Sequence, residues 1–198
     1  DSEERIAVVD AQQTISDEAL AGSIASAFES CFASYDTVLV GGAEEPLYQP
    51  SQGGEPAKLM FREDFPASAL HEIAHWCIAG AKRRQQEDFG YAYICGPRSS
   101  VQQDAFFSAE LKTQCLERAF AAALGLEFRP SADNLQADVD AFSAALDAHE
   151  VSLQAWLTSV PGQRAQRFLQ RLSLLKMSLL QGAVKDSNAP NDQTGAVQ

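Results

Sequence analysis

The chain has 198 residues, of which 45% are hydrophobic and 21% charged, and its formal net charge is −12. This composition is typical of a globular protein with enough residues to form one domain core. Because so negative a surface repels phosphate backbones, we expect no nucleic-acid partner. No apolar run approaches the roughly 20 residues that span a bilayer, so we expect no membrane segment either.

The cysteines and the N-terminus indicate the cellular compartment. None of the four cysteines forms a CxxC pair, and Cys31, Cys77 and Cys115 fall in helical patterns beside apolar residues. We therefore expect all four, Cys95 included, to be reduced. The N-terminus is acidic and polar, unlike a secretory signal, so a cytoplasmic location is predicted.

The first part of the chain is predicted to combine one long helix with two short strands. Residues 1–16 show no clear period and are expected to form a flexible segment. Apolar residues at helical spacing, with acids in the first turn, predict a helix over about 17–34. β-branched and apolar residues predict strands at 37–40, ended by a Gly-Gly pair, and at 58–61. The stretch 43–57, with three prolines and three acids, is predicted to be a long loop.

The rest of the chain is predicted to be mostly helical. A helix from Pro66 to about Arg84 is followed by a short strand at 91–94. Three further helices are predicted, at 105–124, 135–157 and 162–181. The polar tail 182–198 is expected to be disordered. Together these elements predict an α+β fold, a mostly helical single domain with a small sheet, over residues 17–181.

The sequence His71-Glu72-Ile73-Ala74-His75 is an H-E-x-x-H pattern inside the helix predicted to start at Pro66. Residues four apart lie on the same face of a helix, so the two imidazoles can bind one divalent ion. Glu72 projects about 100° around the helix axis from His71. There it can orient a metal-bound water or transfer a proton, so we predict it to be catalytic. The alternative is two histidines at chance spacing.

A third protein ligand is expected, because two imidazoles alone do not make a tight site. Glu110, early in the next long predicted helix, is the candidate, although negative charge is favoured in the first turn of any helix. Other acids compete with it, namely Glu87, Asp88, Asp104 and Glu117. The remaining histidine, His149, is predicted to be a surface residue.

Two other groups of residues are candidates for lining the site. Glu44, Glu45 and Tyr48 surround a proline, and two carboxylates beside a tyrosine can hold an ammonium group. They are also compatible with ordinary solvent-facing loop acids. The run Asp88–Tyr93 carries aromatic rings that can wall a pocket or can pack as a strand.

The run Ala67–Gly80 (ASALHEIAHWCIAG) resembles the elongation factor P hydroxylase family. A generic zinc protease would share only the first five positions of its H-E-x-x-H-W-C-I-A-G block. The likeness extends over about 22–175 and includes Phe28–Phe32, Glu45–Tyr48, Arg83-Arg84, Asp88–Tyr91 and Glu110–Gln114. Ala74 stands where relatives are expected to have serine, and the segment Gly96–Phe107 diverges.

The resemblance implies a bacterial cytoplasmic enzyme that hydroxylates the lysine of elongation factor P already extended with a β-lysyl group. It also implies a fold similar to H-E-x-x-H metalloproteases, with His71, His75 and Glu110 binding iron and with dioxygen as co-substrate. Fe(II) suits these ligands, and Zn is the alternative. We expect Glu44, Glu45 and Tyr48 to receive the doubly cationic β-lysyl-lysine arm.

Three hypotheses remain open at this point. The first is the iron-dependent hydroxylase, which would add one oxygen atom to elongation factor P. The second is a zinc metallopeptidase in which Glu72 is the general base, which would cleave a chain. The third is a non-catalytic binding module, whose activity would survive His71→Ala.

Overall fold

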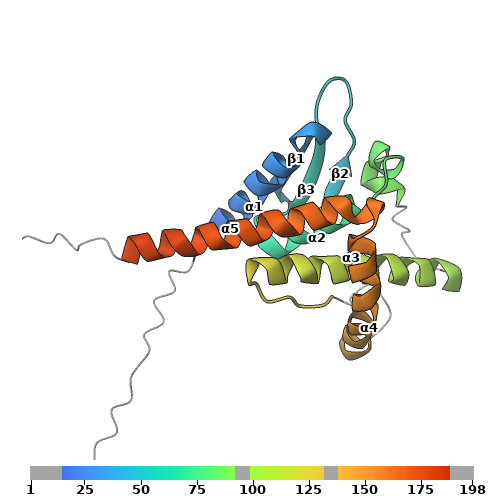
Figure 1. Ribbon diagram of the computed structural model, residues 1–198. Helices are drawn as coiled ribbons and strands as arrows, with labels where there is room; N and C mark the ends of the chain where they lie inside the picture. The colour runs from blue at the N-terminus through green and yellow to red at the C-terminus, as the bar shows by residue number, and fades with distance from the viewer. Residues whose placement is uncertain (1–14, 92–98, 132–137, 188–198) are drawn as a thin grey trace, which may run out of the picture.

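The computed structural model describes residues 15–91, 99–131 and 138–187. Within them the chain forms one α+β domain with five α-helices and a three-stranded sheet (Figure 1). The helices are α1 (Asp17–Cys31), α2 (Pro66–Ile78), α3 (Ser100–Leu124), α4 (Val139–Leu157) and α5 (Gln163–Ser187). The strands are β1 (Thr37–Ala43), β2 (Leu47–Gln49) and β3 (Ala57–Arg62). The predicted fold class, mostly helical with a small sheet, is confirmed.

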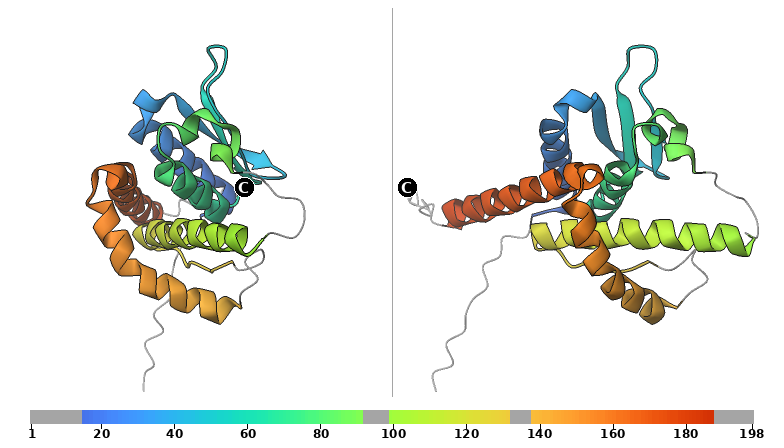
Figure 2. Two further views of the ribbon diagram at one scale, coloured as in Figure 1. Left: turned by 90° about the vertical axis from the view of Figure 1, so that its right-hand side faces the viewer. Right: turned by 45° about the vertical axis from the view of Figure 1, so that its right-hand side comes forward.

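The sheet places α2 at the centre of the domain. The strand order is β1-β3-β2, with β1 parallel and β2 antiparallel to the central strand β3. Burial alternates along β3, so Leu59 and Phe61 face the core while their neighbours are more exposed. The chain then enters α2, which packs against β3, α1 and α3 (Figures 1 and 2).

Aromatic side chains fix the position of α2 against the helices around it. Trp76 of α2 is fully buried, and its ring centroid lies 5.0 Å from that of Phe28 and 4.8 Å from that of Phe32, both from the α1 region. Phe168 of α5 also contacts the ring of Phe28, at 6.1 Å. Each such pair contributes about 0.5–1.5 kcal/mol beyond area burial. The cluster therefore holds α2 in one orientation, with its histidines toward α3.

The helix predicted over Pro66–Arg84 is shorter than expected. It ends at Ile78, because Ala79 has an extended conformation with ψ of 121°. In a continuous helix the Ala79 carbonyl would accept from the backbone four residues on. Here it accepts instead from the Arg84 and Arg164 side chains, at 2.6 Å each. The prediction of a helix through Arg84 was therefore wrong.

The prediction for the first strand and the following loop also needs correction. β1 continues through the Gly-Gly pair to Ala43, because the N–H of Gly42 donates to the Glu63 carbonyl at 2.6 Å and the Ala43 carbonyl accepts from the N–H of Glu63 at 2.9 Å. Gly41 suits this close approach, since a Cβ there would be 2.6 Å from Asp64 Oδ1. The segment predicted as a loop over 43–57 contains the strand β2. Three residues are too few for an alternating pattern to show in the sequence.

Other predicted boundaries also differ. α3 begins at Ser100 rather than at 105, because Ser99 and Gln102 form a reciprocal capping box. α5 continues to Ser187, through the first part of the tail predicted to be disordered. Some predictions lie outside the described residues, namely those for 1–14, for 92–98, for the first part of the fourth helix and for 188–198.

Three of the four cysteines lie among the described residues. Cys31, Cys77 and Cys115 are free and buried, whereas Cys95 lies outside the described residues. None of the helices in the described segments combines the length and the apolar character needed to cross a membrane.

Arg164 ties α5 to the end of α2. Its Nη2 atom donates to the carbonyl oxygens of Cys77 and Ala79, and its guanidinium lies 4.6 Å from the centre of the Trp76 ring.

We predict that Arg164→Met lowers the free energy of unfolding by about 1.5–3 kcal/mol, because hydrogen bonds from a charged group are lost. Urea unfolding measures this change. The control Arg171→Met, at an exposed position of the same helix, should change stability by less than about 0.5 kcal/mol. Equal effects of the two variants would contradict the prediction.

Candidate metal centre

The H-E-x-x-H pattern lies on α2, with both histidines toward α3. The ring centroids of His71 and His75 are 4.7 Å apart, and their Nε2 atoms are 3.1 Å apart. One helical turn separates the two residues, so the rings meet side by side. Their Nε2 atoms therefore point to one place between the two helices.

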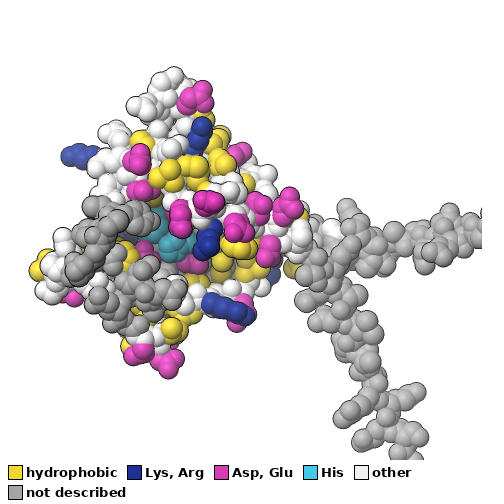
Figure 3. All heavy atoms as spheres, turned by 180° about the vertical axis from the view of Figure 1, so that it is seen from behind, with side chains coloured by type: hydrophobic (Ala, Val, Ile, Leu, Met, Phe, Trp, Pro, Cys, Tyr) yellow, Lys and Arg dark blue, Asp and Glu magenta, His cyan; other side chains and the backbone are white. Residues whose placement is uncertain are grey.

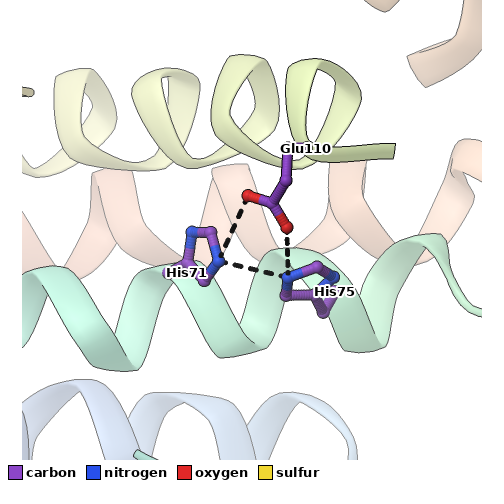
Figure 4. A group of neighbouring side chains, drawn as sticks. All are labelled: His71, His75 and Glu110. Carbon is purple, nitrogen blue, oxygen red and sulfur yellow. Dashed lines mark hydrogen bonds and ion pairs between the residues drawn. The ribbon is translucent and has the colours of Figure 1, made fainter. Parts of the chain in front are cut away.

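Glu110 of α3 approaches the same place (Figure 4). Its Oε1 atom lies 3.4 Å from Nε2 of His75, and its Oε2 atom lies 3.9 Å from Nε2 of His71. Ligand atoms from the three residues all lie within 4.8 Å of one another. Within the described segments, this is the one such group of His, Cys, Asp or Glu side chains. The competing acids are not part of it, namely Glu87, Asp88, Asp104 and Glu117.

Each imidazole makes a hydrogen bond through Nδ1 to another side chain of α3. Nδ1 of His71 lies 2.8 Å from Oε2 of Glu117, and because a carboxylate only accepts, Nδ1 carries the hydrogen. Thr113 donates its single hydroxyl hydrogen to the carbonyl of Ala109 at 3.0 Å, so at 3.4 Å it accepts from Nδ1 of His75. These bonds leave a lone pair on each Nε2 atom.

When both imidazoles are neutral, with their hydrogens on Nδ1, three acceptor groups thus converge without a donor between them. The Nε2 atoms of His71 and His75 and the carboxylate of Glu110 repel one another, and partial burial strengthens that repulsion. A cation between them removes it. Two imidazoles and one carboxylate suit a divalent ion such as Fe(II) or Zn(II), and three protein ligands leave positions open for water or substrate. The residues present therefore fit a divalent metal.

The charges of the group support this interpretation. Burial alone would lower the pKa of His71, but the hydrogen bond and charge of Glu117, together with Glu72 and Glu110, raise it to about 9. Burial would raise the pKa of Glu110, but the hydrogen bond and charge of His75, with the charge of His71, lower it to about 2. In the metal-free protein a proton on His71 therefore supplies the positive charge. A metal would displace that proton on binding.

Glu72, the predicted catalytic residue, lies beside this group without belonging to it. It is 9% exposed, and burial raises its pKa, against the opposing effect of His75 and His71. In the described part of the chain, no hydrogen bond or ion pair to its carboxylate is found. A buried carboxylate without a hydrogen bond or ion pair is stabilised by binding a proton or a cationic group of a substrate.

Aromatic side chains stand on one side of the histidines. The ring of Phe89 is stacked at 6.4 Å from that of His75, and the ring of Tyr91 meets His75 edge-on at 6.1 Å. Tyr48 of β2 stacks on Phe89, with ring centroids 4.2 Å apart. The aromatic residues predicted near the site therefore form a wall beside His75, as far as the described residues extend.

The turn that carries this wall has an unusual backbone. Asp88, Phe89 and Gly90 have φ values of 47°, 58° and 72°, all left-handed. Aspartate and glycine tolerate this region, but for phenylalanine it costs about 1–3 kcal/mol. Tyr48 holds the turn in place, because its backbone N–H donates to Oδ1 of Asp88 at 2.9 Å and its hydroxyl donates to the carbonyl of Arg84 at 2.8 Å.

The residues predicted to bind the substrate therefore differ in their surroundings. Tyr48 is 3% exposed and its hydroxyl is already engaged, so it supports the aromatic wall. Glu44 and Glu45 are exposed between β1 and β2. In the described segments, no hydrogen bond or ion pair joins either of them to His71, His75 or Glu110. The space-filling view shows histidine side chains in a hollow with acidic side chains beside it (Figure 3).

Sequence reasoning missed two contributions of α3. Thr113 was not singled out, and Glu117 was considered only as a rival ligand. Both follow from the spacing of Glu110, since positions i, i+3 and i+7 share one helix face. If Glu110 faces the histidines, then Thr113 and Glu117 must face α2 as well. His149, predicted to be a surface residue, is half-buried on α4 and outside the metal group.

An α+β domain in which a helix pair gathers two histidines and a carboxylate defines a candidate metalloenzyme. The chain belongs to the elongation factor P hydroxylase family, whose model matches residues 27–178. A protein of Haemophilus influenzae described as elongation factor P lysine hydroxylase is 46% identical over 114 residues. These residues are 57% of this chain and 64% of that relative, so the match covers slightly less than two thirds of the relative. The predicted family is confirmed.

The raised pKa of His71 predicts how the stability of the metal-free protein depends on pH. Because the folded value, about 9, lies above the ordinary 6.5, this group contributes stability that is complete below pH 6.5 and lost as the pH rises through 9. We predict that the melting temperature of wild type, relative to His71→Asn, falls over that range in the presence of chelator. Thermal unfolding at a series of pH values measures the difference. His149→Asn is the control. A wild-type advantage that stays constant with pH would argue against the Glu117–His71 interaction.

The clamp on the left-handed turn gives a second prediction. Tyr48→Phe removes the hydroxyl that donates to Arg84, and leaves a half-buried carbonyl without its partner. We expect a loss of about 1–3 kcal/mol in the free energy of unfolding, measured with urea. In the control Tyr91→Phe, at a position that is 39% exposed, the change should stay within about 0.5 kcal/mol. A neutral Tyr48→Phe would show that the stacked rings and the backbone hydrogen bond to Asp88 hold the turn without the hydroxyl.

Proposed function

We propose that this protein is a metal-dependent hydroxylase that uses dioxygen to modify the lysine of elongation factor P already extended with a β-lysyl group. Membership of the family supports the reaction and the substrate, as does the name of the Haemophilus influenzae relative. The observation that carries the metal dependence is the convergence of His71, His75 and Glu110. A translation factor as substrate also supports a cytoplasmic location.

Fe(II) is the metal that we propose, with Zn(II) as the alternative. His71, His75 and Glu110 would hold the ion and leave positions open, and bound iron would supply the activation of dioxygen. In the net reaction, one oxygen atom enters a C–H bond of the substrate. The other leaves as water, with two electrons and two protons from an external reductant.

The substrate would be recognised through its positive charge and its methylene chain. A β-lysyl-lysine arm carries two ammonium groups, and Glu72 offers a buried carboxylate beside the metal ligands. Tyr91, which is 39% exposed, offers aromatic surface near His75 for the alkyl chain, and the buried ring of Phe89 supports that wall. We propose that Glu72 holds a proton or an ammonium group at the reacting end. Glu44 and Glu45, which are exposed, remain candidates for the outer part of the arm.

A zinc metallopeptidase is the second candidate function. The observation that favours it is the position of Glu72, which follows His71 on α2 and lies beside both histidines. In an H-E-x-x-H peptidase this glutamate is the general base for attack of water on a peptide bond. The two candidates share their metal ligands and differ in the product.

Intact-mass measurement of β-lysylated elongation factor P separates these functions. We expect wild type supplied with Fe(II), a reductant and air to add the mass of one oxygen atom. His75→Ala should abolish the addition, because a ligand is lost. His149→Ala, outside the metal group, should retain it. Cleavage of the chain would instead support the peptidase. If metal-loaded wild type left elongation factor P at its original mass, the proposed hydroxylase function would be rejected.

A further inference from the structure

One face of α3 supports all three candidate ligands. Glu117 accepts from His71, Thr113 accepts from His75, and the Nε2 atom of Gln114 donates to Oε2 of Glu110 at 3.3 Å. The supporting residues follow Glu110 at i+3, i+4 and i+7, so they lie along the same side of the helix. Thr113 is 2% exposed, Gln114 3% and Glu117 9%. A polar stripe so deeply buried requires partners, and the ligands are those partners.

Gln114 also fixes this face of α3 to the chain that follows the helix. Its Nε2 atom donates to the Ser131 carbonyl at 2.8 Å, and its Oε1 atom accepts from the Ser131 backbone N–H at 2.9 Å. Both polar ends of the side chain are therefore held, and its orientation toward Glu110 is set.

We infer that Glu117 is the positioning residue that sets the metal affinity of this centre, with Thr113 in a weaker, parallel role. The inference rests on the proposed metal dependence. Glu117 is an anion at 2.8 Å from Nδ1 of His71, whereas Thr113 is a neutral hydroxyl at 3.4 Å from Nδ1 of His75. The shorter, charge-assisted bond holds its ring more firmly. It also makes Nε2 of His71 the more basic ligand atom.

Glu117 is a support and not a fourth ligand in this arrangement. Its carboxylate contacts His71 at Nδ1, on the side of the ring away from the Nε2 atom that faces Glu110. The group of possible ligands accordingly contains His71, His75 and Glu110 without it.

Metal binding tests the inference without any assay of activity. Co(II) and Zn(II) serve as probes, with dissociation constants from chelator competition and with the visible absorption of bound Co(II). We expect Glu117→Gln to weaken binding about 10–100-fold, because outer partners of metal-bound histidines contribute that much. It should also change the Co(II) spectrum. Thr113→Val should weaken binding less, and Thr113→Ser, which keeps the hydroxyl, should restore it. Asp104→Asn, at an exposed position on α3, is the matched control and should bind as wild type does.

The tautomers give a measurement that needs no variant. In Zn(II)-loaded wild type, ¹⁵N NMR of the imidazoles should find Nδ1 protonated and Nε2 metal-bound in both histidines. The opposite arrangement in His71 would overturn the inference. So would wild-type affinity and an unchanged spectrum in Glu117→Gln, and the metal site itself would still stand. Failure of wild type to bind either ion would instead reject the proposed metal dependence.

Discussion

The central constraint in this protein is the approach of three hydrogen-bond acceptors between two packed helices. The Nε2 atoms of His71 and His75 are 3.1 Å apart, and the Glu110 carboxylate lies within 3.9 Å of both. Because Glu117 and Thr113 already use the hydrogens on the Nδ1 atoms, nothing else in the group neutralises the repulsion between these lone pairs. The contact of α2 with α3 is therefore linked to a cation, a proton in the metal-free protein and a divalent metal in the proposed enzyme.

Much of the surrounding structure serves to hold α2 in the orientation that this contact requires. Trp76 packs against aromatic rings from α1 and its C-cap, while Arg164 of α5 donates to the carbonyl groups at the end of α2. On the other side, the left-handed turn at Phe89 is held by Tyr48 from β2, so that an aromatic wall stands beside His75. The end of α2, the edge strand β2 and the turn at Phe89 thus all support the region around His75, although they come from distant parts of the sequence.

The charge of the site agrees with the proposed substrate. Glu110 and, through His71, Glu117 would together balance the two positive charges of a divalent ion, which leaves Glu72 without a hydrogen bond or ion pair among the described residues. A buried carboxylate without a counter-charge is costly, so a cationic substrate that supplies one gains affinity. An ammonium group on a long alkyl arm would supply a positive charge beside Glu72. The methylene groups of the arm would pack against the aromatic wall.

The sequence alone determined the local part of this site, and the tertiary structure decided the rest. The spacing of His71 and His75 predicts their common face, because helical geometry over four residues is local and nearly invariant. The family likeness was also readable from the residues around them. The candidate third ligand, Glu110, was named from the sequence only as the favoured one of several acids and through the family likeness, since it is 35 residues beyond His75. The packing of α3 on α2 decided which acid lies beside the histidines. Likewise the early end of α2, the strand β2 and the roles of Thr113 and Glu117 depend on long-range contacts. Those contacts arise from the packing of whole elements, which no short window of sequence contains.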